Sequence, residues 1–259
     1  EFPELQGIMG GYFSESQGFD KDISLAISEH YLPSGLDSKI QKKPFSVALG
    51  LTDKLDTLVG FFGINEKPTS SKDPYALRRS ALGIIRLMVE NNKNFKIKDL
   101  INHSISLYRI QEFKLSNESL QKELIKFLLD RLRYYMKEKK IRIDIIDACI
   151  DSYGIDHLNK IYRKALALDN IINKQIGDDI VSSYKRAISI LNSELKNKQF
   201  ELSNAADSAI FKNDYEKNLL KRINQLRKYF LNINNDEDYV QSLTNLADSK
   251  KVIFDFFDN

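Results

Sequence analysis

The sequence predicts an all-α protein. Apolar residues recur at intervals of three and four along almost the whole chain, which is the spacing that lines one face of a helix. No segment shows the period of two that marks a half-buried strand. Only 11 of the 259 residues are glycine and 5 are proline, and no proline follows Pro74. Because proline ends or kinks helices, its absence from the rest of the chain favours long helices.

In the first part of the chain, the apolar pattern predicts helices over 23–31, 47–62, 75–89 and 100–110. The first of these ends before Pro33. Asp73 and Pro74 stand directly before the third, as an N-cap followed by a proline at the first helical position.

The second half of the chain is also expected to be helical. A long helix capped by Ser116 or Asn117 carries apolar residues in one phase, with a basic face opposite; these residues are Leu120, Leu124, Phe127, Leu128, Leu132 and Tyr135. Helices are then expected over 143–153, 155–172, 178–195, 205–230 and 236–256. The looser, polar stretch 91–117 suggests a boundary, so the expected domains are 1–95 and 117–259, with 96–116 as a connector.

Composition excludes several classes of protein. With 42% hydrophobic and 29% charged residues, the chain has enough apolar side chains for a core, and its net charge of +3 is too small to indicate a partner. Cys149 is the only cysteine, which excludes a disulfide framework and a thiolate metal cluster; its apolar setting, "IIDACI", predicts a buried side chain. No stretch is long enough to cross a membrane, so we expect a cytoplasmic protein without a membrane partner. Because the chain opens without methionine, we also expect a segment of a longer protein.

The usual motifs of an independent active site are missing. No Gly-x-Gly-x-x-Gly or Walker-type loop is present, so these phosphate cradles are excluded. His30, His103 and His157 are scattered and none precedes an aspartate, so the paired ligands of a His-Asp phosphohydrolase are missing. We therefore expect no catalytic and no metal-binding residues.

Asp53 and Asp56 are three residues apart in "LTDKLDTLVG", on one face of the expected helix. Two carboxylates so placed could bind a metal ion or act as an acid and base pair. Since no histidine stands beside them in the sequence, a structural or RNA-facing role is the favoured interpretation.

Positive charge gathers in three regions that could contact a polyanion. In the first, Lys67 and Lys72 flank a threonine and serine loop, and Arg78, Arg79 and Arg86 follow. Hydroxyl groups and backbone N–H groups at a helix start suit phosphate contact, and arginine adds bidentate geometry. Since Arg78 and Arg79 are about 100° apart on a helix, we expect one to reach phosphate and the other to pair with Asp53 or Asp56. A purely structural role for both arginines is the alternative.

The second region, 114–142, holds nine basic and four acidic residues. Its cationic and aromatic members are Arg131, Arg133, Tyr134, Tyr135, Lys137, Lys139, Lys140 and Arg142, a mixture that could contact phosphates and stack on bases. The third region is "YKRAISIL", with Tyr184, Lys185 and Arg186. For both regions a solvated helix face is the alternative, and for the third it is the favoured one.

Four stretches together resemble a known family: "EFPELQGIMGGYF", "EHYLP", "LTDKLDTLVGFFGINEKPTSSKDPYALRRSALGIIRL" and "YKRAISIL". They are similar to the β subunit of the bacterial heterotetrameric glycyl-tRNA synthetase, in its C-terminal part. The resemblance implies the end of an HD-like helical domain, followed by a helical-bundle anticodon-binding domain of the DALR-like type shared with arginyl-tRNA synthetases. It also implies that the second domain is truncated at its C-terminus.

The resemblance further implies a function as the tRNA-recognition portion of the ligase. The partner α subunit would use ATP to glycylate tRNA(Gly), within a heterotetramer of two α and two β subunits, and this segment would hold no cofactor. The tRNA-binding candidates are Lys72, Arg78, Arg79, Arg131, Arg133, Lys137, Lys185 and Arg186; the last five would lie near the anticodon, and the 68–74 loop near the acceptor side. Two alternatives remain: a degenerate HD-type metal-dependent phosphohydrolase using Asp53, and a structural scaffold for subunit assembly.

Overall fold

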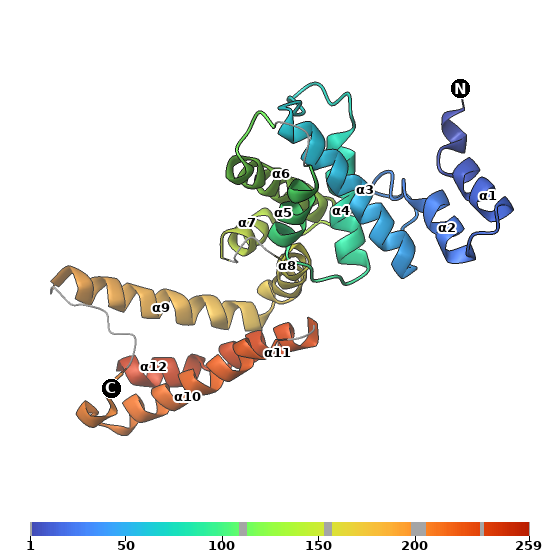
Figure 1. Ribbon diagram of the computed structural model, residues 1–259. Helices are drawn as coiled ribbons and strands as arrows, with labels where there is room; N and C mark the ends of the chain where they lie inside the picture. The colour runs from blue at the N-terminus through green and yellow to red at the C-terminus, as the bar shows by residue number, and fades with distance from the viewer. Residues whose placement is uncertain (1, 109–112, 153–156, 198–205, 234–235, 259) are drawn as a thin grey trace. The chain divides into compact units, whose positions relative to one another are not determined.

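All regular elements in the described part of the chain are helical, which confirms the predicted all-α class there (Figure 1). The computed structural model describes residues 2–108, 113–152, 157–197, 206–233 and 236–258. The α-helices are α1 (Ile8–Ser16), α2 (Lys21–Glu29), α3 (Pro44–Gly63), α4 (Leu77–Glu90), α5 (Ile97–Leu107), α6 (Asn117–Glu138), α7 (Ile143–Ser152), α8 (Leu158–Ile172), α9 (Gln175–Asn197), α10 (Asp214–Leu231), α11 (Asp236–Ala247) and α12 (Lys250–Asp258), with short 3-10 helices at Pro3–Leu5 and Ser208–Ile210. None of the described helices has the length and apolar composition needed to cross a membrane.

The helices divide into two compact units, residues 1–162 and 163–259. The expected connector, 96–116, contains α5, which packs on α3 and α6 inside the first unit. The two units meet between residues 162 and 163, which lie within α8. The HD-like and DALR-like assignment of 1–95 and 117–259 stays a prediction.

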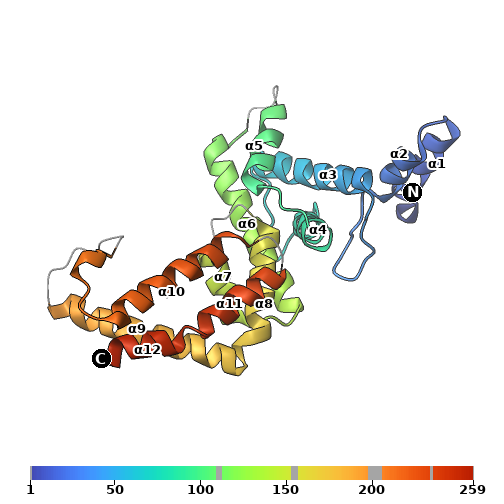
Figure 2. The same ribbon diagram turned by 90° about the horizontal axis from the view of Figure 1, so that it is seen from below.

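The first unit is built around α3 and α4, which pack on each other and on α6 (Figures 1 and 2). Leu58 of α3, Ile85 and Met88 of α4, and Leu124 and Leu128 of α6 are almost completely buried. Burying each such side chain contributes about 1.5–3 kcal/mol to folding. Cys149 on α7 is buried in the same unit, as predicted.

Helix α1 has no counterpart among the expected helices, because its sequence, "IMGGYFSES", contains two adjacent glycines. Glycine weakens an isolated helix by about 1 kcal/mol relative to alanine. Here it permits close packing on α2: a Cβ atom at Gly11 would lie 2.8 Å from Cβ of Ser28. The contact between the two helices therefore outweighs the local preference.

The second unit consists of the C-terminal part of α8 and of α9 to α12. Helix α9 packs on α11 and α12, and α10 packs on the same two helices. Its core is thinner than that of the first unit; the buried side chains include Ile171, Ser183, Tyr239, Ser242 and Ala247.

Two helix boundaries in the second unit differ from the prediction. The helix expected over 205–230 begins at Asp214, because Asn213 and Glu216 form a reciprocal capping box there; residue 205 lies outside the described residues. The helix expected over 236–256 is two helices. Arg222 of α10 donates to the carbonyl of Asn245 and to Oγ of Ser249, and α11 ends between these two residues.

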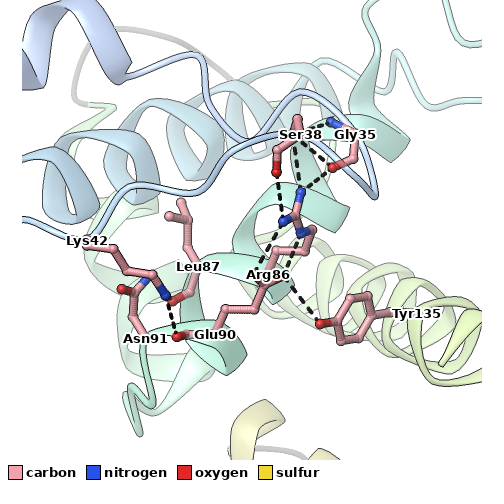
Figure 3. Close-up of polar contacts among 8 residues, drawn as sticks. All are labelled: Gly35, Ser38, Lys42, Arg86, Leu87, Glu90, Asn91 and Tyr135. Carbon is pink, nitrogen blue, oxygen red and sulfur yellow. Dashed lines mark hydrogen bonds and ion pairs between the residues drawn. The ribbon is translucent and has the colours of Figure 1, made fainter.

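Arg86 of α4 binds the segment that connects α2 to α3 (Figure 3). The guanidinium group donates to the carbonyls of Gly35 and Ser38 and to Oγ of Ser38. Its Nε pairs with Oε1 of Glu90 at 2.6 Å, and the hydroxyl of Tyr135 on α6 also donates to this oxygen at 3.4 Å. Arg86 is only 4% exposed. Burial and the neighbouring Glu90 carboxylate raise the pKa of Tyr135, which keeps the phenol protonated as a donor.

Lys54 of α3 is the second buried cation of this region. It lies in phase with the buried Leu58 and is only 5% exposed. Its Nζ donates to the carbonyl of His30 at 2.8 Å, and its methylene chain lies against Gly83 of α4, where a Cβ atom would stand 2.6 Å from Cε of the lysine. Burial lowers the pKa of Lys54 to about 8, against a smaller opposite effect of the Asp53 charge.

Replacing Arg86 by methionine should destabilise the first unit by about 3–5 kcal/mol, since Glu90 and the carbonyls of Gly35 and Ser38 then lose a buried partner. Urea unfolding measures this change. Arg79→Met on the same helix is a matched control, because Arg79 is exposed and its replacement should change stability by no more than about 0.5 kcal/mol. Similar stabilities of the two variants would show that the Arg86 contacts do not hold the fold together.

Lys54→Met should remove a pH dependence of stability. The folded-state pKa of about 8 lies below the ordinary value of 10.5, so the unfolded chain binds more protons in this interval and stability rises with pH. From about pH 7.5 to about pH 9.5, Lys54 should add about 2 kcal/mol to the free energy of unfolding.

Urea unfolding of the wild type and of Lys54→Met at both pH values measures this increment. Lys39→Met, at an exposed position, should keep it. An equal rise in the Lys54→Met variant would contradict the assignment to Lys54.

Candidate nucleic-acid interface

The loop between α3 and α4, residues 64–76, is held by hydrogen bonds around Thr69. The backbone N–H of Thr69 donates to the carbonyl of Lys72 at 2.9 Å, and the N–H of Lys72 donates to Oγ1 of Thr69 at 3.2 Å. The guanidinium group of Arg78 donates to the carbonyl of Thr69. The side chain of Lys72 is exposed at this ordered turn and has no partner among the described residues.

The predicted start of α4 is wrong: the N-cap is Ala76 and not Asp73, and Pro74 lies before the helix and not at its first position. The Asp73 carboxylate nevertheless binds two N–H groups of the first turn. Oδ1 of Asp73 accepts from the N–H of Leu77 at 2.8 Å, and Oδ2 accepts from the N–H of Arg78 at 3.0 Å. Pro74 and Tyr75 precede the helix, and Ala76 has the left-handed φ of 54°. Because the Asp73 carboxylate already occupies the start of α4, a phosphate at this position has to be bound by side chains and not by these N–H groups.

Arg78 and Arg79 point in different directions, as their helical positions require. Arg78 turns back to the loop, whereas Arg79 is exposed and has no hydrogen-bond or ion-pair partner among the described residues. Neither arginine pairs with Asp53 or Asp56, so the expected internal ion pair is wrong. Asp56 instead accepts a hydrogen bond from the hydroxyl of Tyr108 at 2.8 Å. Burial first, and this bond second, raise the pKa of Tyr108.

Arg79 and Lys54 line one cavity of about 440 Å³ in the first unit, here called the Lys54 pocket. Asp53 and the exposed Tyr31 and Tyr75 also line it. The full lining consists of Gln6, Tyr31, Pro33, Ser34, Asp53, Lys54, Thr57, Pro74, Tyr75, Ala76, Arg79 and Ser80. It thus combines two cations, one carboxylate and two accessible aromatic rings.

The three candidates on α6 have different surroundings. Arg131 stacks its guanidinium group on the rings of Phe127 and Tyr134, at 5.9 and 5.7 Å from the ring centroids. Arg133 pairs with Asp147 at 2.9 Å, so much of its charge is compensated. Lys137 is exposed without a partner among the described residues.

In the second unit, Lys185 and Arg186 also differ. Lys185 is exposed on α9 next to Tyr184, whose side chain is 64% exposed. Arg186 pairs with Asp258 of α12 and lies 4.6 Å from the ring centroid of Phe254. The structure therefore gives Arg186 a role in joining α9 to α12, and leaves Lys185 as the accessible cation.

Two further features were not expected from the sequence. The first is the burial of Lys54, which was not predicted from the sequence. Lys54 lies three residues after Leu51 and four before Leu58, and this spacing places it on the apolar face of α3. The second is the α10 stripe, the exposed residues Lys217, Lys221, Asn224 and Lys228 at intervals of four, three and four, which line a hollow of about 570 Å³. Lys217 pairs with Asp214 at 3.0 Å.

Among the described residues, no group of three or more histidine, cysteine, aspartate or glutamate side chains is placed to hold a metal ion. Asp53 lines the Lys54 pocket without a second carboxylate or a histidine in that lining. The structure thus offers the phosphohydrolase alternative no candidate metal ligand set in the part of the chain that it describes.

Comparison with known proteins gives a consistent result. The family model for the glycyl-tRNA synthetase beta subunit matches residues 1–151. Among curated relatives, the glycine–tRNA ligase beta subunit of Ruegeria sp. (strain TM1040) is 34% identical over 258 residues, covering 100% of this chain and 36% of the relative. That of Cereibacter sphaeroides (strain ATCC 17029 / ATH 2.4.9) is 35% identical over 259 residues, covering 100% and 37%.

The glycine–tRNA ligase beta subunit of Rickettsia prowazekii (strain Madrid E) is 34% identical over 259 residues, again with 100% of this chain and 36% of the relative covered. The chain thus spans a little over a third of the length of these relatives. The family model and the curated relatives identify the same family. The chain therefore belongs to the glycyl-tRNA synthetase beta subunit family.

Proposed function

We propose that this chain is the tRNA-recognition portion of a glycine–tRNA ligase beta subunit. It binds tRNA(Gly) and orients it for ATP-dependent glycylation, which a partner α subunit performs within a heterotetramer of two α and two β subunits. In this proposal the chain itself binds no cofactor, and it acts in the cytoplasm.

The observation that carries this proposal is a set of exposed cations without protein partners among the described residues. Lys72 and Arg79 belong to the loop and first turn of α4, Lys137 to α6, and Lys185 to α9. An exposed lysine that is free of ion pairs can neutralise a phosphate without first breaking another contact. Both compact units thus offer phosphate contacts.

Aromatic groups accompany these cations, as single-stranded RNA recognition requires. Arg131 stacks on the ring of Tyr134, which is 39% exposed. The exposed Tyr184 is the sequence neighbour of Lys185. The α10 stripe adds Lys221 and Lys228 with the amide of Asn224 between them, so that unit 2 presents both phosphate-binding groups and a base-edge donor and acceptor. We assign the anticodon contact to the second unit, and a separate tRNA contact to the basic end of α6.

The engaged arginines have a different role in this proposal. Arg78 donates to the loop between α3 and α4, Arg133 pairs with Asp147, and Arg186 pairs with Asp258. Each arginine thereby holds neighbouring elements in place. Their replacement would affect RNA binding through the fold more than through a lost phosphate contact.

Neutralising one exposed lysine in each unit, as Lys137→Gln and Lys185→Gln, should weaken binding of glycine tRNA. The slope of log affinity against log salt concentration should become shallower by about one for each variant, because one fewer counterion is released. Fluorescence anisotropy of labelled tRNA across a salt series measures both quantities.

Lys39→Gln serves as the matched control, since Lys39 is also exposed and belongs to the 30–43 segment, which contains none of the proposed phosphate-contact residues. Unchanged slopes in all three variants would contradict the proposed interface and favour the scaffold alternative.

A glycine tRNA with an altered anticodon should bind more weakly than the natural tRNA, and its salt slope should stay nearly the same, because base contacts specify sequence while phosphate contacts do not. The same anisotropy assay measures this difference. Equal affinity for the two tRNAs would remove anticodon reading and leave a general RNA-binding surface.

A further inference from the structure

The Lys54 pocket contains a buried positive charge that no protein anion neutralises directly. Of the three N–H groups of the Lys54 ammonium, one donates to the carbonyl of His30, and no other partner occurs among the described residues. Asp53 lies beside Lys54 on α3 but forms no ion pair with it. A charge in this position has lost most of its hydration, so a bound anion would be stabilised more strongly here than on the open surface.

A second cation reaches the same cavity from another helix. Arg79 lines the pocket from the first turn of α4, and its planar guanidinium group has no partner among the described residues. Guanidinium groups bind phosphate oxygens in a bidentate manner. Since Asp73 already occupies the N–H groups of this turn, Arg79 and Lys54 are the donors available to an anion.

The remaining lining fits the rest of a nucleotide. Tyr75 is 44% exposed and its ring is held by stacking on Phe61, with centroids 4.0 Å apart. Tyr31 is 43% exposed and packs against the ring of His30. An aromatic ring fixed in this way offers a base a face to stack on, and Asp53 can accept hydrogen bonds from sugar hydroxyl groups.

The cavity size limits the ligand further. A volume of about 440 Å³ lies within the range of about 300–1,000 Å³ that small-molecule pockets occupy. It accommodates one nucleotide and excludes a duplex.

We propose that the Lys54 pocket binds a single unpaired nucleotide, with its phosphate between Lys54 and Arg79 and its base against Tyr75 or Tyr31. The nucleotide could be free or part of an RNA strand. Binding of a nucleotide within an RNA strand rests on the proposed tRNA function. Binding of a free nucleotide does not depend on that function.

The test is a calorimetric titration of the full chain with adenosine and cytidine 5′-monophosphates and with inorganic phosphate as the reference anion. We expect the mononucleotides to bind at millimolar concentration or better, and more tightly than phosphate. Lys54→Met and Arg79→Gln should each weaken mononucleotide binding about tenfold, because each removes a hydrogen-bonding charged group. Arg79 is exposed, so its variant tests the proposal even where Lys54→Met alters the fold.

Lys39→Met is the control for a general loss of positive charge and should bind the mononucleotides as the wild type does. Equal affinity of all three variants, or no binding at millimolar mononucleotide, would overturn the proposal. Equal binding of phosphate and mononucleotide, with no effect of Tyr75→Leu and Tyr31→Leu together, would overturn the base contact and hence the assignment to a nucleotide.

Competition with labelled tRNA distinguishes the two sources. Displacement of tRNA by the mononucleotide, absent in Arg79→Gln, supports an RNA nucleotide in the pocket; binding of the mononucleotide without displacement supports a free ligand. Failure of tRNA binding leaves the mononucleotide titration unaffected, so the two proposals can fail separately.

A pH series gives an additional readout. Because the pKa of Lys54 is lowered to about 8, mononucleotide affinity should fall from about pH 7 to about pH 9, and this fall should be absent in Lys54→Met. The other charged or titratable side chains of the pocket are Asp53 on α3, Arg79 on α4, Tyr31 and Tyr75, and Lys54 meets His30 only through the backbone carbonyl of that residue. An identical pH profile in the Lys54→Met variant would overturn the role of Lys54.

Discussion

The contact between Arg86 and the 30–43 segment is the interaction on which the first unit depends. This segment has no regular structure, so its backbone groups need partners from elsewhere in the protein. Arg86 supplies donors to two of its carbonyls, and Gln41 within the segment donates to the carbonyls of Glu29 and Leu32 at 2.8 and 2.7 Å. The arginine thereby joins α4 to a part of the chain about 50 residues earlier, which no local preference could do.

Glu90 extends this interaction to a third element. Its carboxylate accepts from Arg86 and from Tyr135 of α6, and its backbone carbonyl accepts from Nζ of Lys42 at 2.9 Å (Figure 3). The positions of α4, α6 and the segment before α3 are therefore mutually determined. The Lys54 pocket is lined by residues of this segment and of α3 and α4, so its shape follows from the same contacts.

Much of this architecture could be predicted from local signals. Periodicity located most helices, and Ser116 was identified as a cap because its side chain acts within a few residues. What could not be predicted depends on contacts between distant segments. Helix α1 needs α2 against its glycines, the break before α12 needs Arg222 of α10, and the partners of Arg186 and Arg133 come from other helices. The sequence also identified exposed cations such as Lys137, but it could not distinguish them from arginines whose charge is used internally.

Gly83 has a consequence for how relatives of this chain should be compared. Gly83 does not line the Lys54 pocket, yet its missing side chain leaves room for the methylene chain of Lys54. A larger residue there would displace the ammonium group while Tyr31, Tyr75 and Arg79 all remained unchanged. Two homologues with the same ligand-facing residues could thus differ in whether the pocket holds a charge at all, and the difference would be found on the helix behind it.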